Sequence, residues 1–159
     1  MESYDYVIVG AGSAGCVLAD RLSADGRYAV LVLEAGGSDR RPWIRMPIGY
    51  GKTFHDPSVN WRFHSAPEEA LDGRSLYVPR GKVVGGSSSI NGLVYSRGLP
   101  EDYEDWRAAG NPGWGWDAVR PVFERIERHE AADGTSDGMG PVPVADRSAG
   151  YHPIKRHFA

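Results

Sequence analysis

Residues 4–15 read YDYVIVGAGSAG, a short apolar run that leads directly into three closely spaced glycines. The aromatic and β-branched residues of Tyr4–Val9 are typical of a buried strand. Behind the glycines, apolar residues repeat at helical spacing over residues 14–22, and Gly26 can end that helix. A second apolar strand follows at Ala29–Leu33. The sequence therefore predicts a strand–turn–helix–strand unit, the start of an α/β fold with a parallel sheet.

The glycines of this unit follow the spacing Gly-x-Gly-x-x-Gly, with Gly10, Gly12 and Gly15. The first allows a tight turn, the second lets a pyrophosphate approach the backbone, and the third lets the helix pack on the strand. The phosphates then lie at a helix N-terminus, where free N–H groups and the dipole favour negative charge. Glu34 ends the second strand, where a carboxylate can bind both ribose hydroxyls of an adenosine. The unit predicts a dinucleotide site, and the alternative is an α/β turn that binds nothing.

The acidic residue narrows the choice of dinucleotide. A carboxylate at Glu34 favours an unphosphorylated ribose and therefore disfavours NADP. FAD and NAD both fit this unit. The next two residues, Ala35 and Gly36, form a small-residue turn of the kind that often follows this acid in flavoproteins, which favours FAD.

A second block, residues 79–98, reads PRGKVVGGSSSINGLVYSRG and is dense in glycine and serine. Gly85 and Gly86 allow the backbone to approach a flat ligand, and successive N–H groups can form an anion-binding nest. Ser87–Ser89 and Asn91 supply donors and acceptors with little bulk. The alternative is a flexible linker, but apolar residues flank the block on both sides. We therefore expect a second ligand-binding loop here.

Together the two blocks resemble the glucose–methanol–choline (GMC) oxidoreductase family. Residues 81–104 are similar to the first signature of that family, and residues 6–19 with Leu33–Gly36 are similar to its FAD-binding start. Further matching segments are Asn60-Trp61, Gly73-Arg74, residues 102–106 and Gly113-Trp114. Within the family, the sequence resembles the bacterial alcohol and choline dehydrogenases.

The resemblance implies a Rossmann-like FAD-binding domain, forming the N-terminal part of a larger two-domain flavoprotein that removes a hydride from an alcohol carbon. By analogy, the Gly10–Gly15 loop holds the pyrophosphate, Glu34 holds the ribose and Arg80–Val94 wraps the flavin side. Trp61 either lies against the cofactor or packs in the core. The residues expected to contact FAD are Gly10, Gly12, Ser13, Ala14, Gly15, Glu34, Ala35, Trp61, Arg80, Val84, Gly85, Gly86, Asn91, Gly92, Leu93 and Val94.

The sequence departs from the family pattern in two ways, which concern the attachment of FAD and the length of the chain. In covalent members of the choline-oxidase type, a histidine precedes the asparagine of the signature and bonds the flavin, whereas this chain has Ile90 there. Noncovalent FAD is therefore expected. Family members are also several times longer and carry their catalytic histidine far downstream. We expect residues 1–159 to be an incomplete FAD-binding portion, with the catalytic residues beyond residue 159.

Composition excludes several other classes of protein. The chain is 41% apolar and 25% charged, with a net charge of −3, so neither wholesale disorder nor a general nucleic-acid binder is expected. No apolar run is long enough for a membrane helix. The start lacks a secretory signal, and the one cysteine excludes an internal disulfide framework, so we expect a cytoplasmic protein.

The remaining sequence predicts organisation rather than chemistry. Residues 40–60 are expected to form a lid-like loop, and a helix is expected to begin at Pro100. Asp117–Glu127 has an apolar stripe typical of an amphipathic helix, and the charges of Glu124–Arg128 are interpreted as its solvated face. Pro141–Val144 is expected to be a short edge strand. We find no repeat and no domain boundary.

Three functions remain open at this stage. The first is the FAD-binding part of an enzyme that oxidises a small alcohol and passes electrons to oxygen, a quinone or another acceptor. The second is a non-redox relative of the hydroxynitrile lyase or photodecarboxylase type. The third is a bare dinucleotide-binding module. The five histidines lack metal-ligand spacing, so no metal site is expected.

Overall fold

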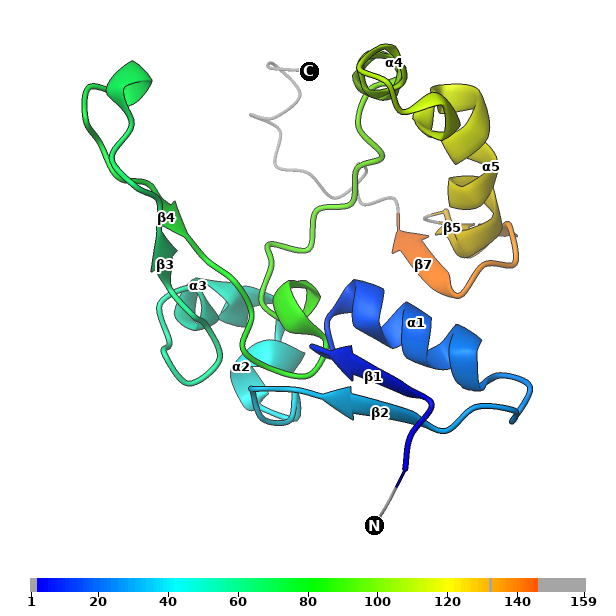
Figure 1. Ribbon diagram of the computed structural model, residues 1–159, viewed down its shortest axis with the longest axis horizontal. Coiled ribbons are helices and arrows are strands. Elements are labelled where there is room, and N and C mark those ends of the chain that lie inside the picture. The colour runs from blue at the N-terminus through cyan, green and yellow to red at the C-terminus, as the bar shows by residue number, and fades with distance from the viewer. Residues whose placement is uncertain (1–2, 132, 146–159) are drawn as a thin grey trace. The chain divides into compact units, whose positions relative to one another are not determined.

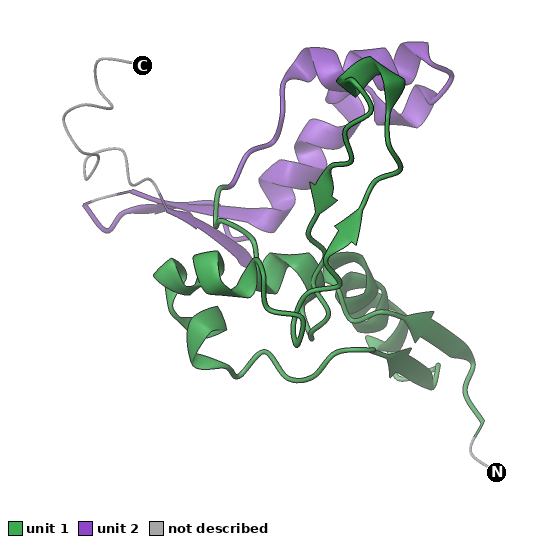
Figure 2. Cartoon of the chain, turned by 90° about the vertical axis from the view of Figure 1, so that its left-hand side faces the viewer, with its two compact units in different colours: residues 1–94 green, residues 95–159 purple. Residues whose placement is uncertain are grey.

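The computed structural model describes residues 3–131 and 133–145. The chain divides into two compact units, residues 1–94 (unit 1) and residues 95–159 (unit 2), coloured separately in Figure 2. Nothing in the sequence marks this boundary, because it falls inside the glycine- and serine-rich block at residues 79–98. Composition does not change there, so only the packing of each unit reveals the division.

Unit 1 begins with the predicted strand–helix–strand unit (Figure 1). Strand β1 (Tyr6–Val9) pairs in parallel with β2 (Val30–Leu33), and helix α1 (Ser13–Ser23) lies between them in sequence. The register places Tyr6 opposite Val30 and Val9 opposite Leu33. The predicted α/β fold is therefore confirmed for this part of the chain.

The expected loop at residues 40–60 contains three short helical turns instead. They are α2 (Pro42–Arg45), the 3₁₀ turn η1 (Pro47–Gly49) and α3 (Tyr50–Thr53). Pro42 and Pro47 each open a turn, a position where the missing N–H costs nothing and the fixed φ suits a helix. The prediction of an irregular loop was therefore wrong in detail.

The rest of unit 1 is a hairpin followed by the second glycine block. Strands β3 (Phe63–His64) and β4 (Tyr77–Val78) pair antiparallel, with the turn η2 (Glu69–Leu71) between them. The turn η3 (Gly86–Ser89) then lies within the glycine block.

The core of unit 1 is small. Its main cluster contains Val59, Val83 and Ile90, which are 1%, 0% and 5% exposed, with Ile44 packed against them. Within the described residues, by contrast, no residue of α1 is fully buried, and Val9 of β1 is 85% exposed. Parallel strands are normally covered on both faces. The described part of unit 1 therefore leaves its parallel strands only partly covered.

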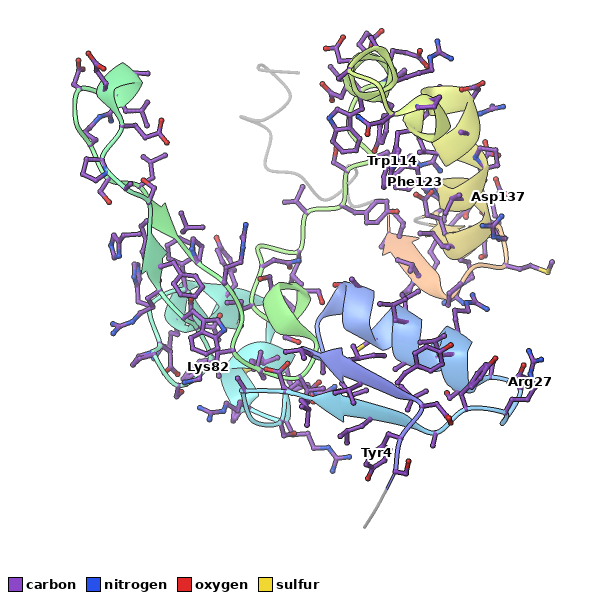
Figure 3. All side chains as sticks on the ribbon, in the orientation of Figure 1. Tyr4, Arg27, Lys82, Trp114, Phe123 and Asp137 are labelled. Carbon is purple, nitrogen blue, oxygen red and sulfur yellow. The ribbon has the colours of Figure 1, made fainter. Side chains whose placement is uncertain are left out.

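Unit 2 contains a helical region with an aromatic cluster. Its helices are α4 (Pro100–Ala108), the 3₁₀ turn η4 (Pro112–Trp114) and α5 (Trp116–Ile126). Pro100 opens α4 as predicted, and the Asp102 carboxylate accepts a hydrogen bond from the Leu99 N–H (3.0 Å). The apolar stripe of α5 lines a mostly apolar cavity together with aromatic residues of α4 and η4, among them Trp114 (Figure 3). The predicted amphipathic helix is confirmed.

Unit 2 also holds a three-stranded sheet in the order β6-β5-β7, with β5 (Glu127–Glu130), β6 (Ser136–Asp137) and β7 (Val142–Ala145). Strand β7 lies at one edge, as predicted. The prediction that Glu127 belongs to a solvated helix face was wrong. Glu127 is extended, opens β5 and is only 1% exposed. Among the residues that the structure describes, no helix is long and apolar enough to cross a membrane.

Candidate functional site

The two glycine blocks, about seventy residues apart in sequence, meet in unit 1. Gly12 and Gly85 pair in parallel, and the Gly85 N–H donates to the Ala11 carbonyl (2.7 Å). A Cβ on Gly86 would lie 2.9 Å from the Gly12 Cα, closer than real Cβ atoms come to a backbone atom. Figure 1 shows the turn of η3 beside the start of α1. The glycines therefore allow two backbone segments to touch.

The N-terminus of α1 is suited to an anion. Gly12 is the N-cap residue, and in this described region neither a capping side chain nor an acidic residue occupies the first turn. The first N–H groups of a helix lack intrahelical partners and carry the positive end of its dipole. Ser13 Oγ adds a hydroxyl at this point and donates to Ser88 Oγ of η3 (3.2 Å). A pyrophosphate fits this end of the helix without displacing a carboxylate.

Gly10 and Gly15 shape the turn that leads into α1. Gly10 adopts φ +98°, a conformation that L side chains rarely adopt, and its N–H donates to the Leu33 carbonyl (2.7 Å). A Cβ on Gly15 would lie 2.0 Å from the Gly10 carbonyl oxygen. Both glycines therefore have the steric roles that the spacing predicts.

Glu34 lies beside this turn, just after β2, and is half-buried. One carboxylate oxygen accepts the Ala11 N–H (2.7 Å) and the other accepts the Gly36 N–H (2.8 Å). A carboxylate offers about four lone-pair positions, so two remain for ribose hydroxyls. Sequence reasoning gave Glu34 only the ribose, whereas the structure adds a second task, holding the turn at Ala11 to the end of β2.

A second close approach of backbone segments lies behind Glu34. A Cβ on Gly36 would lie 2.0 Å from the Lys82 carbonyl oxygen, and the Val84 N–H donates to the Gly37 carbonyl (3.0 Å). The segment after β2 is therefore joined to the glycine block as closely as the segment after β1 is. The sequence showed Ala35-Gly36 only as a small-residue turn, because the position of Lys82 is a tertiary fact.

Asn60 organises the region around Trp61 and Arg80. Its side-chain oxygen accepts the N–H groups of Arg62 (2.9 Å) and Arg80 (3.0 Å), and the residue is 2% exposed. The Trp61 N–H donates to the Arg80 carbonyl (2.9 Å). The Trp61 ring stacks on Phe63 with centroids 5.8 Å apart, and the ammonium group of Lys82, labelled in Figure 3, lies 4.7 Å from its centroid. Trp61 is 44% exposed, so part of its ring is free to meet a ligand.

The segment Asn91–Val94 ends unit 1 and follows the buried Ile90. The Asn91 side-chain oxygen accepts the Leu93 N–H (2.9 Å), and Leu93 has φ +61°, in the left-handed region. Leu93 and Val94 are 61% and 86% exposed. This segment is therefore open and has an unfavourable backbone conformation, a combination common at ligand-binding sites.

The structure thus brings some of the predicted residues of the two motifs into contact and leaves others apart. Direct contacts or backbone pairing link those around the helix N-terminus, which are Gly10, Gly12, Ser13, Gly15, Glu34, Gly85 and Gly86. Ala14 lies in the first turn of α1. The remaining predicted residues, all of which are exposed, are Ala35, Trp61, Arg80, Val84, Asn91, Gly92, Leu93 and Val94. Sequence reasoning missed Ala11 as a site residue, because its contribution is a backbone N–H that any residue carries.

The histidines are the candidates for catalytic acid–base groups, and the described ones have other contacts. His55 stacks on Tyr77 (5.5 Å), and His129 lies 2.8 Å from a Glu127 carboxylate oxygen. His152 and His157 lie outside the described residues. Among the described residues, no group of His, Cys, Asp and Glu could hold a metal ion. The described chain therefore offers a nucleotide cradle more clearly than a reaction centre.

Known proteins are similar to this chain in sequence and architecture. The family model "GMC oxidoreductase" matches residues 4–159. An oxygen-dependent choline dehydrogenase of Photobacterium profundum is 52% identical over 141 residues, covering 88% of this chain and 25% of that protein. An alcohol dehydrogenase [acceptor] of Pseudomonas putida is 52% identical over 130 residues, covering 82% of this chain and 24% of that protein.

A solved structure agrees with these matches. The crystal structure of pyridoxine 4-oxidase from "Mesorbium loti" superposes with a TM-score of 0.85 at 37% identity, covering 98% of this chain and 31% of that chain. The chain thus spans a quarter to a third of the length of these relatives. The matches run through both glycine motifs and both compact units, and on this evidence the chain belongs to the GMC oxidoreductase family.

Proposed function

We propose that this chain is the N-terminal, FAD-binding portion of an enzyme that oxidises a small alcohol. The observation that carries the proposal is the pairing of Gly12 with Gly85 at the uncapped N-terminus of α1. It joins the two motifs expected from the family into one site. We call this site the cradle; it comprises the Gly10–Gly15 turn, Glu34, Gly85 and Gly86. The names of the choline and alcohol dehydrogenases among its relatives support an alcohol substrate.

Different residues of the cradle bind different parts of FAD. The first turn of α1 and the hydroxyl of Ser13 bind the pyrophosphate, and Glu34 binds the adenosine ribose while holding the Ala11 turn. Val84 and Asn91–Val94 are exposed beyond the cradle and serve the flavin end. FAD, when bound, accepts the hydride that leaves the alcohol carbon.

The flavin is held without a covalent bond through this motif. Ile90 stands where covalent relatives of the choline-oxidase type carry histidine, and its side chain is buried with Val59 and Val83. An aliphatic side chain has no atom that can form the bond. Within this motif, the flavin is then retained by noncovalent contacts.

The base that removes the alcohol proton comes from outside residues 1–159. Such a base has to reach the substrate oxygen and titrate near neutral pH, which is most often the work of histidine. The rings of His55 and His64 pack against a tyrosine ring, and His129 lies against the buried Glu127 carboxylate. These contacts support the proposal. The electron acceptor is oxygen, a quinone or another carrier. From the sequence argument above, we also propose a cytoplasmic location.

The first test is the colour of the complete protein that contains this chain. Purified from cells, it should be yellow and show flavin absorption, and acid precipitation should leave the flavin in the supernatant. A complete protein without flavin, and without uptake on reconstitution, contradicts the cofactor. Flavin that stays with the precipitate contradicts noncovalent binding.

The second test compares the complete protein with residues 1–159 alone, using primary alcohols, excess FAD and an artificial electron acceptor. We expect turnover only from the complete protein. Activity in the shorter chain would place the catalytic base inside this sequence. A complete protein that binds FAD but oxidises no alcohol would favour the non-redox alternative.

A further inference from the structure

The buried side chain of Asn60 cross-links separate segments of unit 1. It is 2% exposed, and all four hydrogen-bonding positions of its amide are occupied. The oxygen accepts the N–H groups of Arg62 (2.9 Å) and Arg80 (3.0 Å). The nitrogen donates to the Phe54 carbonyl (2.9 Å) and to the Tyr77 hydroxyl (3.3 Å). One side chain therefore ties the end of α3 and strand β4 to the start of the second glycine block.

The contacts around Asn60 hold its amide in one orientation. The Tyr77 hydroxyl donates to the same Phe54 carbonyl (2.6 Å), and the two rings meet edge-on with centroids 5.2 Å apart. Turning the amide over would direct its nitrogen at two N–H groups and its oxygen at a carbonyl. A buried donor or acceptor without a partner is costly, so only the observed orientation is favourable.

Asn60 fixes the backbone on both sides of Trp61. Arg62 has φ +53°, a left-handed conformation that is unfavourable for arginine, and its N–H is bound by the Asn60 oxygen. The Trp61 N–H donates to the Arg80 carbonyl (2.9 Å), and the N–H of Arg80 is also bound by Asn60. Trp61 and Arg80 are both exposed. These contacts therefore hold the two residues in place without covering their side chains.

The rest of the glycine block has anchors that do not involve the Asn60 side chain. The Lys82 N–H donates to the Val59 carbonyl (2.7 Å), and the Gly85 N–H donates to the Ala11 carbonyl (2.7 Å). Both bonds join backbone to backbone. Loss of the Asn60 side chain should therefore loosen the start of the block, whereas the part beside the N-terminus of α1 stays in place.

Resting on the proposed function, we propose that Asn60 is a positioning residue for the flavin end of FAD. It holds the exposed ring of Trp61 and the segment at Arg80 in the arrangement that the flavin meets. ADP has the adenosine and pyrophosphate of FAD but no flavin, so its binding depends on the Gly10–Gly15 turn and Glu34. Asn60 therefore contributes to the affinity for FAD and not to the affinity for ADP.

The test measures the affinities of the complete protein for FAD and for ADP. Asn60→Ala removes all four hydrogen bonds, and we expect it to weaken FAD binding roughly tenfold and to leave ADP binding within about twofold. The visible absorption of the flavin that remains bound should shift towards that of free FAD, because its surroundings are less firmly held. Ser75→Ala is the control in the same unit, since it removes an exposed hydrogen bond to the Ser65 carbonyl (2.6 Å). The control should change neither affinity.

A milder variant keeps the test decisive if Asn60→Ala does not fold. Tyr77→Phe removes the hydroxyl that contacts Asn60 and Phe54 and keeps the ring, and we expect it to weaken FAD binding about threefold without changing ADP binding. An unchanged FAD affinity, or an equal loss for FAD and ADP, overturns the positioning role. A wild-type protein that binds ADP but not FAD contradicts the proposed cofactor instead, so the two failures are distinguishable.

Discussion

The candidate FAD site of unit 1 and a side-chain cluster of unit 2 are each held together by different kinds of atoms. We call the second the Glu127 cluster; its members are Tyr95, Arg97, Glu127 and His129. In unit 1, backbone pairs with backbone at Gly12 and Gly85, and Glu34 receives two backbone N–H groups. In unit 2, Glu127 receives the side-chain donors of Tyr95 and Arg97 and contacts the His129 ring. The first site depends on glycines without a Cβ and on backbone donors, and the second depends on side-chain donors.

This difference decides how visible each site is in the sequence. Two backbones can approach closely only where glycine removes the Cβ, so the first site leaves a pattern of glycines. A side-chain cluster requires only that its members meet in space. Arg97 and Glu127 are 30 residues apart and carry no spacing rule. The comparison leads to four predictions, ordered by expected effect.

The strongest test of the backbone-built site is Gly36→Ala. A Cβ there would lie 2.0 Å from the Lys82 carbonyl oxygen, and backbone cannot move aside cheaply. We expect a loss of at least about 3 kcal/mol in the free energy of unfolding of the complete protein, and weakened FAD retention. Gly37→Ala is the control, because a Cβ there meets nothing within 4 Å. Equal effects of the two substitutions on unfolding would contradict the close approach.

The side-chain cluster is tested by the pH dependence of stability. Its hydrogen bonds lower the pKa of Glu127 from 4.5 to about 2. A carboxyl group whose pKa is lower in the folded state stabilises fully above its unfolded pKa and loses that effect as the pH falls through the folded value. The stability advantage of wild type over Glu127→Gln should therefore be about 3 kcal/mol at neutral pH. It should fade between about pH 4.5 and pH 2.

Denaturant unfolding of the complete protein without FAD, repeated at several pH values, measures this difference. Glu130→Gln serves as the control for general acid effects, since Glu130 lies on the same strand and is only partly buried. A wild-type advantage that stays constant across the acid range would mean that the charge of Glu127 does not stabilise the fold.

Glu34→Gln tests the proposed role of Glu34 in nucleotide binding. The substitution removes the charge and leaves one acceptor oxygen, so either the Ala11 or the Gly36 N–H loses its partner. Charge-assisted hydrogen bonds are worth about 1.5–3 kcal/mol, so FAD affinity should fall by one to two factors of ten. ADP affinity should fall equally, because the ribose is common to both. Glu69→Gln, on the 3₁₀ turn η2 of the same unit, should change neither affinity. Unchanged FAD retention in Glu34→Gln would refute the assignment.

The smallest effect is expected at the hydroxyl pair of Ser13 and Ser88. Their hydrogen bond is exposed and 3.2 Å long, so each alanine variant should weaken FAD binding by no more than about fivefold. Ser13 donates to Ser88, and Ser88 in turn donates to the Gly85 carbonyl (2.6 Å). The effects of substituting Ser13 and Ser88 should therefore be coupled. A double-mutant cycle on FAD affinity should give less than the sum of the single effects. Full additivity would mean that the hydroxyls act separately.

Several elements could be predicted because local physics decides them. The apolar runs and glycine spacing of residues 4–33 specify β1, α1 and β2, and Pro100 marks the start of α4. Glycines with one steric solution, such as Gly10 and Gly15, were assigned the turn and packing roles that the structure shows. Resemblance in both motifs also led to the family that the comparisons support.

Other features depend on which distant residues meet. Glu127 was interpreted as solvated because its neighbours Glu124, Arg125 and Arg128 are charged, and a charged run usually lies on a surface. Its burial follows from the chain turning from α5 into β5 at that residue and from Arg97 arriving beside it. The short helices at residues 42–53 were also missed, although Pro42 and Pro47 mark where two of them begin.

The sequence by itself determined the glycine turn, the strands on either side of it, and the acidic residue that follows the second strand. These rest on short-range rules: steric freedom at glycine, apolar periodicity, and the dipole of a helix N-terminus. Only the tertiary structure decided that Glu34 also binds Ala11 and Gly36, that Gly36 has to be bare against Lys82, and that Glu127 is buried among donors. Each of these depends on a contact between residues whose separation in sequence obeys no period, so the folded chain alone brings them together.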